Sequence, residues 1–192
     1  MFSGLAQMVA AVGSTVLGSG GTMTARRLHD LADANGKVTS SLELAANASL
    51  GASSVQLRLP SAAPGLVGTL PLGGKVTIAG TTYSATADAK ASGGTVTVSI
   101  TPVLAAAAVA GVAAVLGAGV WSLGTCLRQD PSRATTPDGG ATSAILVPIA
   151  NVASGYSPRL GDVVTDHKGT ARPVLRLGDE VAGSWELFVG AG

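Results

Sequence analysis

Few side chains in this sequence have the types that covalent chemistry requires. The chain has one cysteine, Cys126, and two histidines, His29 and His167. A thiol nucleophile needs a neighbouring base, and a Ser-His-Asp triad needs three groups held in a defined geometry. Cys126 has no histidine or acid near it in the sequence, so we expect it to be a small buried hydrophobe. Each histidine stands beside an aspartate in a polar, turn-like stretch, where we expect a solvated side chain.

The sequence gives equally little support for a metal-binding or phosphate-binding site. Asp162, Asp166 and Asp179 lie near glycines, but they lack the Asp-x-Asp-x-Asp-Gly order of a calcium loop, so turn-forming roles are expected. The glycine-rich segment 18–21 lacks the Gly-Lys-Ser/Thr ending of a phosphate-binding loop and is interpreted as a linker. We therefore expect no catalytic residue, no metal and no cofactor, and we predict that the protein is not an enzyme.

Two pairs of arginines are the remaining candidates for a binding role. Arg26 and Arg27 would point to opposite faces of a strand, whereas Arg172 and Arg176 would share one face. Either pair could face phosphates. The net charge is only +1 and the basic residues form no longer stripe, which argues against electrostatic binding of nucleic acid. We expect solvated or inter-subunit ion-pair roles for these side chains.

The composition of the 192 residues narrows the class of protein further. Charged residues make up 12% of the chain, against roughly 25% in ordinary soluble domains. Hydrophobic residues make up 46% but aromatic residues only 3%, so the core must be built from small side chains. This hydrophobic content with a low net charge argues against intrinsic disorder. The single cysteine excludes a disulfide framework within the chain.

The scarce charges leave two uncharged stretches, residues 1–25 and 91–127. The first lacks the positive region that opens a signal peptide. Its larger apolar residues recur at helical spacing and predict a short amphipathic helix over residues 2–12, with a partly ordered tail as the alternative. The second contains the apolar run 103–121, which is long enough to span a bilayer. Because this run is rich in alanine and glycine and lacks a flanking basic cluster, we expect a short helix followed by a strand there.

Alternation of apolar and polar residues predicts β structure over most of the remaining chain. Residues 50–100 predict an antiparallel module of about four strands whose solvent face carries threonine and serine. Pro173 indicates an edge strand or a bulge, and residues 128–142, with two prolines and two adjacent glycines, predict an exposed arm. The expected strands are 22–27, 38–44, 55–59, 75–79, 82–87, 95–100, 143–147, 162–165, 171–177 and 184–189.

These patterns together predict a mainly β fold. We expect a small antiparallel β-barrel or sandwich with a short N-terminal helix and an inserted antiparallel β-module. Residues 1–44 and 121–192 would form the barrel, and residues 45–120 the inserted module.

Several segments of the chain resemble neck and tail proteins of tailed bacteriophages. Within residues 50–120 the resemblance lies in Ala52-Ser-Ser-Val-Gln-Leu, Gly74-Lys-Val-Thr-Ile-Ala-Gly80, Tyr83-Ser-Ala-Thr-Ala87 and Val98-Ser-Ile-Thr-Pro-Val-Leu-Ala-Ala-Ala107. The flanking parts resemble small head-completion proteins, through the helix at 2–12, the strand Met23-Thr-Ala-Arg-Arg27, Tyr156-Ser-Pro-Arg-Leu-Gly-Asp-Val-Val-Thr165, a glycine turn at 169 and Arg172-Pro-Val-Leu-Arg176.

The resemblance implies a head–tail connector of the head-completion or stopper type. Such a protein forms a homo-oligomeric ring of six or twelve copies in the virion neck, after assembly in the host cytoplasm. The ring would join a portal or adaptor protein to a tail terminator or tail tube protein, and would help to retain the genome. The resemblance also implies a non-specific contact with DNA in the channel, and no contact with a membrane. The helix at 2–12, the arm at 128–142 and the threonine- and serine-faced module are the expected contact surfaces.

Three other interpretations stay open at this point. The protein could be a tail-side component, either a tail terminator or a minor tail protein. The run 103–121 leaves a small membrane pore-former as a further alternative. A wall hydrolase carried in the virion is the enzymatic alternative, for which the sequence supplies no acid pair, metal cluster or activated nucleophile.

Overall fold

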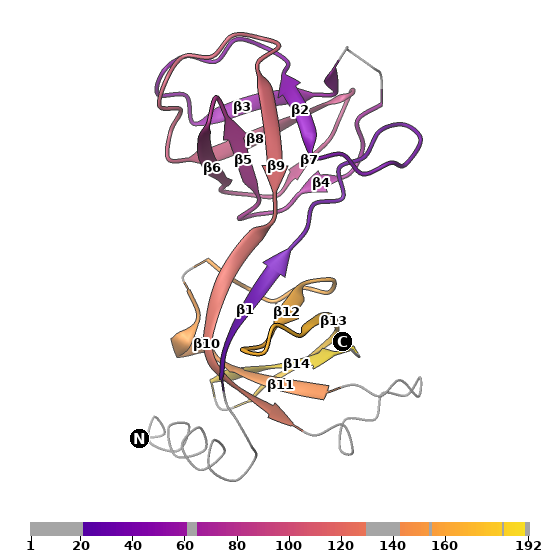
Figure 1. The fold of residues 1–192 in the computed structure, drawn as a ribbon, viewed down its shortest axis with the longest axis vertical. Helices are drawn as coiled ribbons and strands as arrows, with labels where there is room; N and C mark the ends of the chain where they lie inside the picture. Colours follow the sequence, from indigo (N-terminus) through magenta and orange to yellow (C-terminus); the bar gives the residue numbers. More distant parts are fainter. Residues whose placement is uncertain (1–20, 61–64, 130–142, 154, 182, 191–192) are drawn as a thin grey trace. The chain divides into compact units, whose positions relative to one another are not determined.

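The computed structural model describes residues 21–60, 65–129, 143–153, 155–181 and 183–190. The chain is mainly β and divides into two compact units (Figure 1). Residues 27–119 form one unit, here called the inserted barrel. The described residues of 1–26 and 120–192 form the other, here called the terminal barrel. The predicted mainly β fold with an antiparallel barrel is therefore confirmed, and the inserted module, whose shape we did not predict, is a second barrel.

The inserted barrel is a closed sheet of six short strands. They are β2 (Ser41–Leu44), β3 (Ser54–Arg58), β5 (Lys75–Ile78), β6 (Thr81–Ala85), β8 (Thr95–Thr101) and β9 (Ala113–Gly117). Their order around the barrel is β2-β3-β8-β6-β5-β9, and every neighbouring pair is antiparallel. Two further strands, β4 (Thr69–Leu70) and β7 (Ala89–Lys90), form a separate two-stranded sheet.

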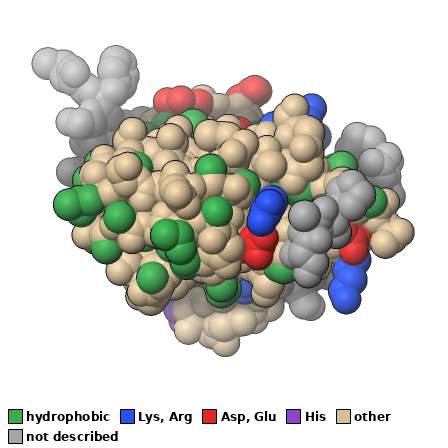
Figure 2. Space-filling model, turned by 90° about the horizontal axis from the view of Figure 1, so that it is seen from above, with side chains coloured by type: hydrophobic (Ala, Val, Ile, Leu, Met, Phe, Trp, Pro, Cys, Tyr) green, Lys and Arg blue, Asp and Glu red, His purple; other side chains and the backbone are tan. Residues whose placement is uncertain are grey.

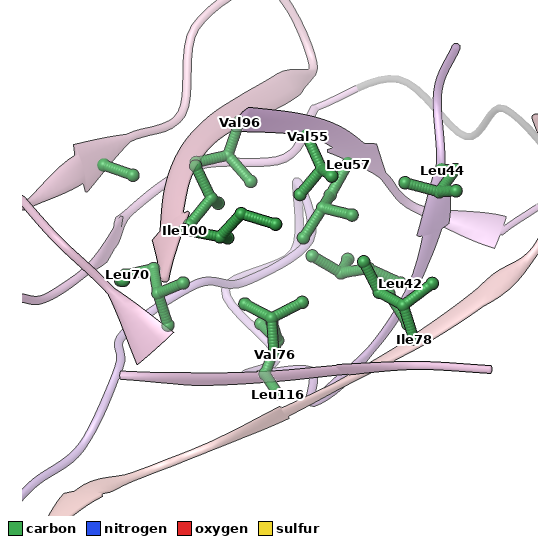
Figure 3. Close-up of a cluster of buried hydrophobic side chains, with 14 of the residues drawn as sticks. Leu42, Leu44, Val55, Leu57, Leu70, Val76, Ile78, Val96, Ile100 and Leu116 are labelled. Atoms are coloured by element: carbon green, nitrogen blue, oxygen red, sulfur yellow. The ribbon is translucent and has the colours of Figure 1, made fainter. Parts of the chain in front are cut away.

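Aliphatic side chains fill the inserted barrel, because alternate residues of each strand point inward. Val96, Val98 and Ile100 of β8 are buried, while the threonines and serine between them face outward. Leu42 and Leu44 of β2 meet Leu57 of β3 and the inward residues of β5 and β9 in the same cluster (Figure 3). This is the core of small and medium side chains that the composition requires.

The terminal barrel also has six strands, drawn from both ends of the described chain. They are β1 (Gly21–Arg27), β10 (Gly119–Gln129), β11 (Ser143–Pro148), β12 (Val163–Thr165), β13 (Ala171–Val181) and β14 (Ser184–Val189), and a 3-10 turn covers Ile149–Asn151. Their closed order is β1-β10-β11-β14-β13-β12. Leu123, Ile145 and Leu187 are buried in its core, against which Trp121 and Trp185 pack.

The inserted unit begins earlier in the chain than residue 45, where we expected it. The structure places residues 27–44 within it, because β2 pairs with both β3 and β9 and is needed to close the barrel. Leu31, which precedes β2, is also buried in its core. The C-terminal boundary lies at residue 119, next to the expected residue 120.

The Ala-rich helix expected within residues 103–121 is wrong. Residues 102–112 form a loop apart from one isolated bridge, and the chain continues into β9 and β10. Alanine favours helix in isolation, but here Leu104, Ala114 and Leu116 are buried in the inserted barrel. The packing of these residues therefore overrides the local preference.

Other expectations have mixed outcomes. The helix expected at 2–12 lies outside the described residues, as does most of the arm expected at 128–142. Residues 128 and 129 belong to β10.

Pro173 lies in β13 next to a shift of register between Val174 and Arg176, so the predicted bulge is confirmed.

Candidate interaction surface

Cys126 is fully buried in the terminal barrel. Its sulfur lies 3.6 Å from the carbonyl oxygen of Leu123 and 3.7 Å from that of Gly124. Burial raises the pKa of the thiol to about 12, so the thiolate needed for nucleophilic chemistry does not form near neutral pH. The interpretation of Cys126 as a small hydrophobe is thus confirmed.

The two histidines occupy different environments. His167 is exposed, as expected, and lies in the turn after β12. His29 is instead half-buried, and burial lowers its pKa although neighbouring Asp30 acts to raise it. Among the described residues, no group of three potential metal ligands includes either histidine.

The three aspartates near glycines do not converge on a metal site within the described chain. Asp162 is fully buried, and its carboxylate accepts hydrogen bonds from the hydroxyl of Tyr156 and the backbone N–H of Arg159, both at 3.0 Å. Asp166 accepts the backbone N–H groups of Lys168 and Thr170 at 2.9 Å, which is the expected turn-forming role. Desolvation acts to raise the pKa of Asp166, but these two bonds and the neighbouring charges of His167 and Arg172 lower it overall. Asp179 is exposed in β13.

Neither pair of arginines lies on one shared, exposed face of its strand. Arg26 is exposed and Arg27 is buried, so the predicted opposite faces are confirmed. Arg176 stacks over the ring of Phe188, 4.0 Å from its centroid. We expected Arg172 and Arg176 to share one face of the strand, and this expectation is wrong. The bulge after Val174 shifts the register of β13, so that Arg176 pairs with Phe188 and no longer lies on the same face as Arg172.

The wall of the inserted barrel carries hydroxyl groups in place of most charges. The outward residues of β8 are Thr95, Thr97, Ser99 and Thr101. The hydroxyls of Thr77 and Thr82 lie 2.8 Å apart, and the ammonium of Lys75 donates to the hydroxyl of Ser84 at 2.7 Å.

The wall also holds an ion pair across neighbouring strands. Arg58 and Glu43 face each other in register, with Nε 2.8 Å from Oε1. Each of these two charges is therefore compensated within the wall itself.

One end of the inserted barrel is apolar as well as uncharged. The loop 45–53 joins β2 to β3, and the loop 102–112 joins β8 to β9; together we call them the apolar tip. Neither loop contains an Asp, Glu, Lys or Arg. Leu50 is 70% exposed, Val109 63% and Val103 52%, with exposed alanines between them.

The apolar tip is a defined structure, since its two loops bond to each other through the backbone. Ala48 and Ala108 exchange both N–H···O bonds, at 2.8 and 2.9 Å, and the N–H of Gly51 donates to the carbonyl of Leu104. The side chain of Asn47 accepts the N–H of Ala110 at 2.9 Å. Figure 2, the view from above Figure 1, shows hydrophobic side chains scattered among uncharged atoms over the left part of the nearest surface, with charged side chains at its upper edge and to the right of the middle.

The sequence predicted part of this surface and missed part. It predicted the threonine- and serine-faced wall through the alternation of β8. It missed the apolar tip, because the run 103–121 suggested a helix and residues 45–54 a featureless loop. The available signal was the absence of charge in both loops, which becomes informative once they are known to be neighbours.

Comparison with protein-family models, curated proteins and solved structures finds no match to this chain. In the part of the chain that the structure describes, no helix is long and apolar enough to cross a membrane.

Proposed function

We propose that this protein is a structural component of a phage neck, a head–tail connector that assembles into a homo-oligomeric ring. The ring would lie between the portal or adaptor on the head side and the tail terminator or tail tube on the other. It would help to retain the packaged genome by binding and gating, without covalent chemistry.

The observation that carries the proposal is the surface of the inserted barrel. Its wall is lined by hydroxyl groups, its ion pair Glu43–Arg58 is internally compensated, and its tip exposes Leu50, Val103 and Val109. The cores of protein interfaces are depleted in charged residues, and exposed apolar patches mark binding sites. A surface of this kind suits contact with neighbouring subunits better than permanent exposure to water.

The positions of the motifs that carry the resemblance add support. The four motifs of the module include parts of β3, β5, β6 and β8, which all belong to the inserted barrel. The motifs of the flanking parts include parts of β1, β12 and β13, which belong to the terminal barrel. The division of the resemblance between module and flanks thus matches the division of the chain into two units.

Electron microscopy of the purified full-length chain, alone and mixed with the portal protein from the same genome, tests the proposal. The expected result is a ring of six or twelve copies that attaches to the portal. Labelling of the protein in intact virions should place it between head and tail. A chain that joins neither portal nor tail contradicts the proposal, and a location confined to the tail replaces it by a tail-terminator or minor tail role.

A further inference from the structure

We propose that Asn35 is the residue at which this protein undergoes spontaneous deamidation, and that Asp33 sets the rate of the reaction. The inference assigns a site of covalent modification in the inserted barrel and does not depend on the proposed function. It is carried by the dipeptide Asn35-Gly36 in an exposed turn and by the hydrogen bonds that hold this turn.

Deamidation joins the side chain of an asparagine to the backbone of the following residue. The backbone nitrogen of Gly36 loses its proton to hydroxide and attacks Cγ of Asn35, and the Cγ–Nδ2 bond breaks as ammonia leaves with a proton taken from water. Water then opens the resulting succinimide ring at one of its two carbonyl groups. The product at position 35 is either an aspartate or an isoaspartate. Water is the co-reactant, and no oxidant or reductant takes part.

The surroundings of Asn35 leave the attacking nitrogen accessible once the turn opens. Gly36 has no side chain to hinder the attack, and its φ angle of +79° is a conformation that glycine adopts freely. A Cβ at this position would meet nothing within 4 Å, so the space beside the nitrogen is open. Asn35 itself is exposed, so that water reaches its carboxamide.

The other two asparagines of the chain are less suited to the reaction. Asn47 is followed by alanine, and its Oδ1 accepts the N–H of Ala110 at 2.9 Å, which fixes the side chain. Asn151 is followed by valine, whose branched Cβ crowds the backbone nitrogen. The chain therefore contains its own two reference sites for the reactivity of Asn35.

Hydrogen bonds to Asp33 hold the turn closed. Its backbone carbonyl accepts the N–H of Gly36 at 2.9 Å, and this is the nitrogen that must react. Its carboxylate oxygen Oδ1 accepts the N–H groups of Asn35 at 2.9 Å and Lys37 at 3.0 Å, as asparagine and aspartate do in turns. Because the bonded nitrogen of Gly36 must be released before it can lose its proton and approach Cγ, the reaction requires local opening of the turn. Asp33 therefore slows the deamidation of Asn35.

Deamidation changes both the charge and the backbone of the turn. One new carboxylate takes the formal net charge of the chain from +1 to 0. An isoaspartate also adds a backbone atom between Asp33 and Lys37, whose N–H and carbonyl groups bond at 3.0 Å in the unmodified turn. The modified chain should therefore separate from the original by ion-exchange chromatography.

Peptide mass spectrometry of the full chain, incubated at neutral and at alkaline pH, tests the site. Position 35 should account for most of the early product, and the reaction should be faster at alkaline pH because the nitrogen must lose its proton. Asn35→Gln is the control, since the longer side chain would have to close a larger ring, and this variant should lose the early product. Equal early conversion at Asn35, Asn47 and Asn151 overturns the assignment.

The same measurement on variants of Asp33 tests the control of the rate. Asp33→Ala removes the carboxylate and should accelerate deamidation of Asn35 in the folded protein by about tenfold or more, because two hydrogen bonds no longer oppose opening. Asp33→Asn keeps an acceptor and should stay close to the wild-type rate. In urea the three proteins should react at the same rate.

The comparison in urea separates the effect of the turn from that of the local sequence. Folded wild-type protein should react more slowly than unfolded wild-type protein, a result that does not require Asp33→Ala to fold. Equal rates in folded and unfolded wild type, or equal rates for folded wild type and folded Asp33→Ala, overturn the role of Asp33. None of these outcomes depends on whether the protein forms a ring.

Discussion

The hydroxyl of Tyr156 lies 3.0 Å from a carboxylate oxygen of Asp162, and both residues are buried in the terminal barrel. The ring of Tyr156 also packs against Trp121 and Trp185, with centroid distances of 5.3 and 6.0 Å. One side chain thus joins the aromatic part of the core to a buried polar group. Asp162 itself precedes β12 and accepts the N–H of Arg159.

Replacing Tyr156 by phenylalanine should destabilise the terminal barrel by about 1–3 kcal/mol, because it removes a donor from a buried carboxylate and keeps the aromatic contacts. Both tryptophans of the chain, Trp121 and Trp185, pack in this barrel, so tryptophan fluorescence during urea unfolding reports on it. A midpoint equal to that of the wild type would show that the Tyr156–Asp162 bond contributes nothing to stability.

Cys126 should make the stability depend on pH in the alkaline range. The pKa of its thiol is about 12 in the folded protein, against an ordinary value of 9.0, so the folded state keeps a proton that the unfolded state releases. This contribution is fully present below pH 9 and is lost as the pH rises from there to about 12. The free energy of unfolding should fall by up to roughly 1.4 kcal/mol per pH unit in that window.

The measurement is urea unfolding of the wild type and Cys126→Ala between pH 8 and pH 10. The variant is expected to lose this part of the pH dependence, and to be less stable at every pH because of the cavity. Parallel pH profiles for the two proteins would exclude Cys126 as the source.

Replacement of two glycines of the inserted barrel by alanine should lower the stability by different amounts. Gly68 and Gly80 have φ angles of +96° and +82°, so alanine is strained at both, by about 1–2 kcal/mol. A Cβ at Gly68 would also press on the backbone carbonyl of Asp30, whereas one at Gly80 meets nothing within 4 Å. Gly68→Ala should therefore cost about 1–3 kcal/mol more than Gly80→Ala.

Thermal unfolding followed by circular dichroism compares these two variants directly. The matched positive φ angles make Gly80→Ala the control for backbone strain alone. Equal melting temperatures would mean that the chain around Asp30 moves aside without cost.

Tyr83→Phe should loosen the apolar tip while leaving the barrel closed. It removes the acceptor of the Ala105 N–H and leaves the buried ring in place. Hydrogen exchange at the Ala105 amide, measured by NMR, should become faster than in the wild type, with a loss of global stability of about 1 kcal/mol. The amide of Val98 in β8 serves as the internal control. Unchanged exchange at Ala105 would indicate that water replaces the hydroxyl without loss of protection.

The alternation of residues predicted much of the strand content for a physical reason. In β8, three inward aliphatic residues alternate with threonine and serine, and in β1 Met23 and Ala25 alternate with Thr22 and Thr24. A half-buried strand requires this period of two, so the pattern can be seen without knowledge of the partner strand. The turn at residues 33–36 was predictable in the same way, because Asp33 accepts the N–H groups of Asn35 and Lys37.

Long-range pairing explains where the sequence-based predictions were wrong. The pairing of Leu42 with Ala114 closes the inserted barrel and moves its boundary to residue 27, although the two residues are far apart in the chain. A short helix at the start of the run 103–121 was the local preference of an alanine-rich segment, and burial of Leu104 in the barrel core overrode it, while the strand expected after the helix is present as β9 and β10. The bulge after Val174 changed the face of Arg176. None of these effects has a signature in a short window of sequence.

The sequence by itself determined that the protein is mainly β, poor in charge and without an evident catalytic group, since these properties follow from residue types and their local period. Only the tertiary structure decided that Ala48 and Ala108 lie side by side and that Leu50, Val103 and Val109 are exposed on the two bonded loops of the apolar tip. The physical reason is that a hydrogen-bonded contact between distant loops depends on closure of the barrel, which brings the ends of β2, β3, β8 and β9 together.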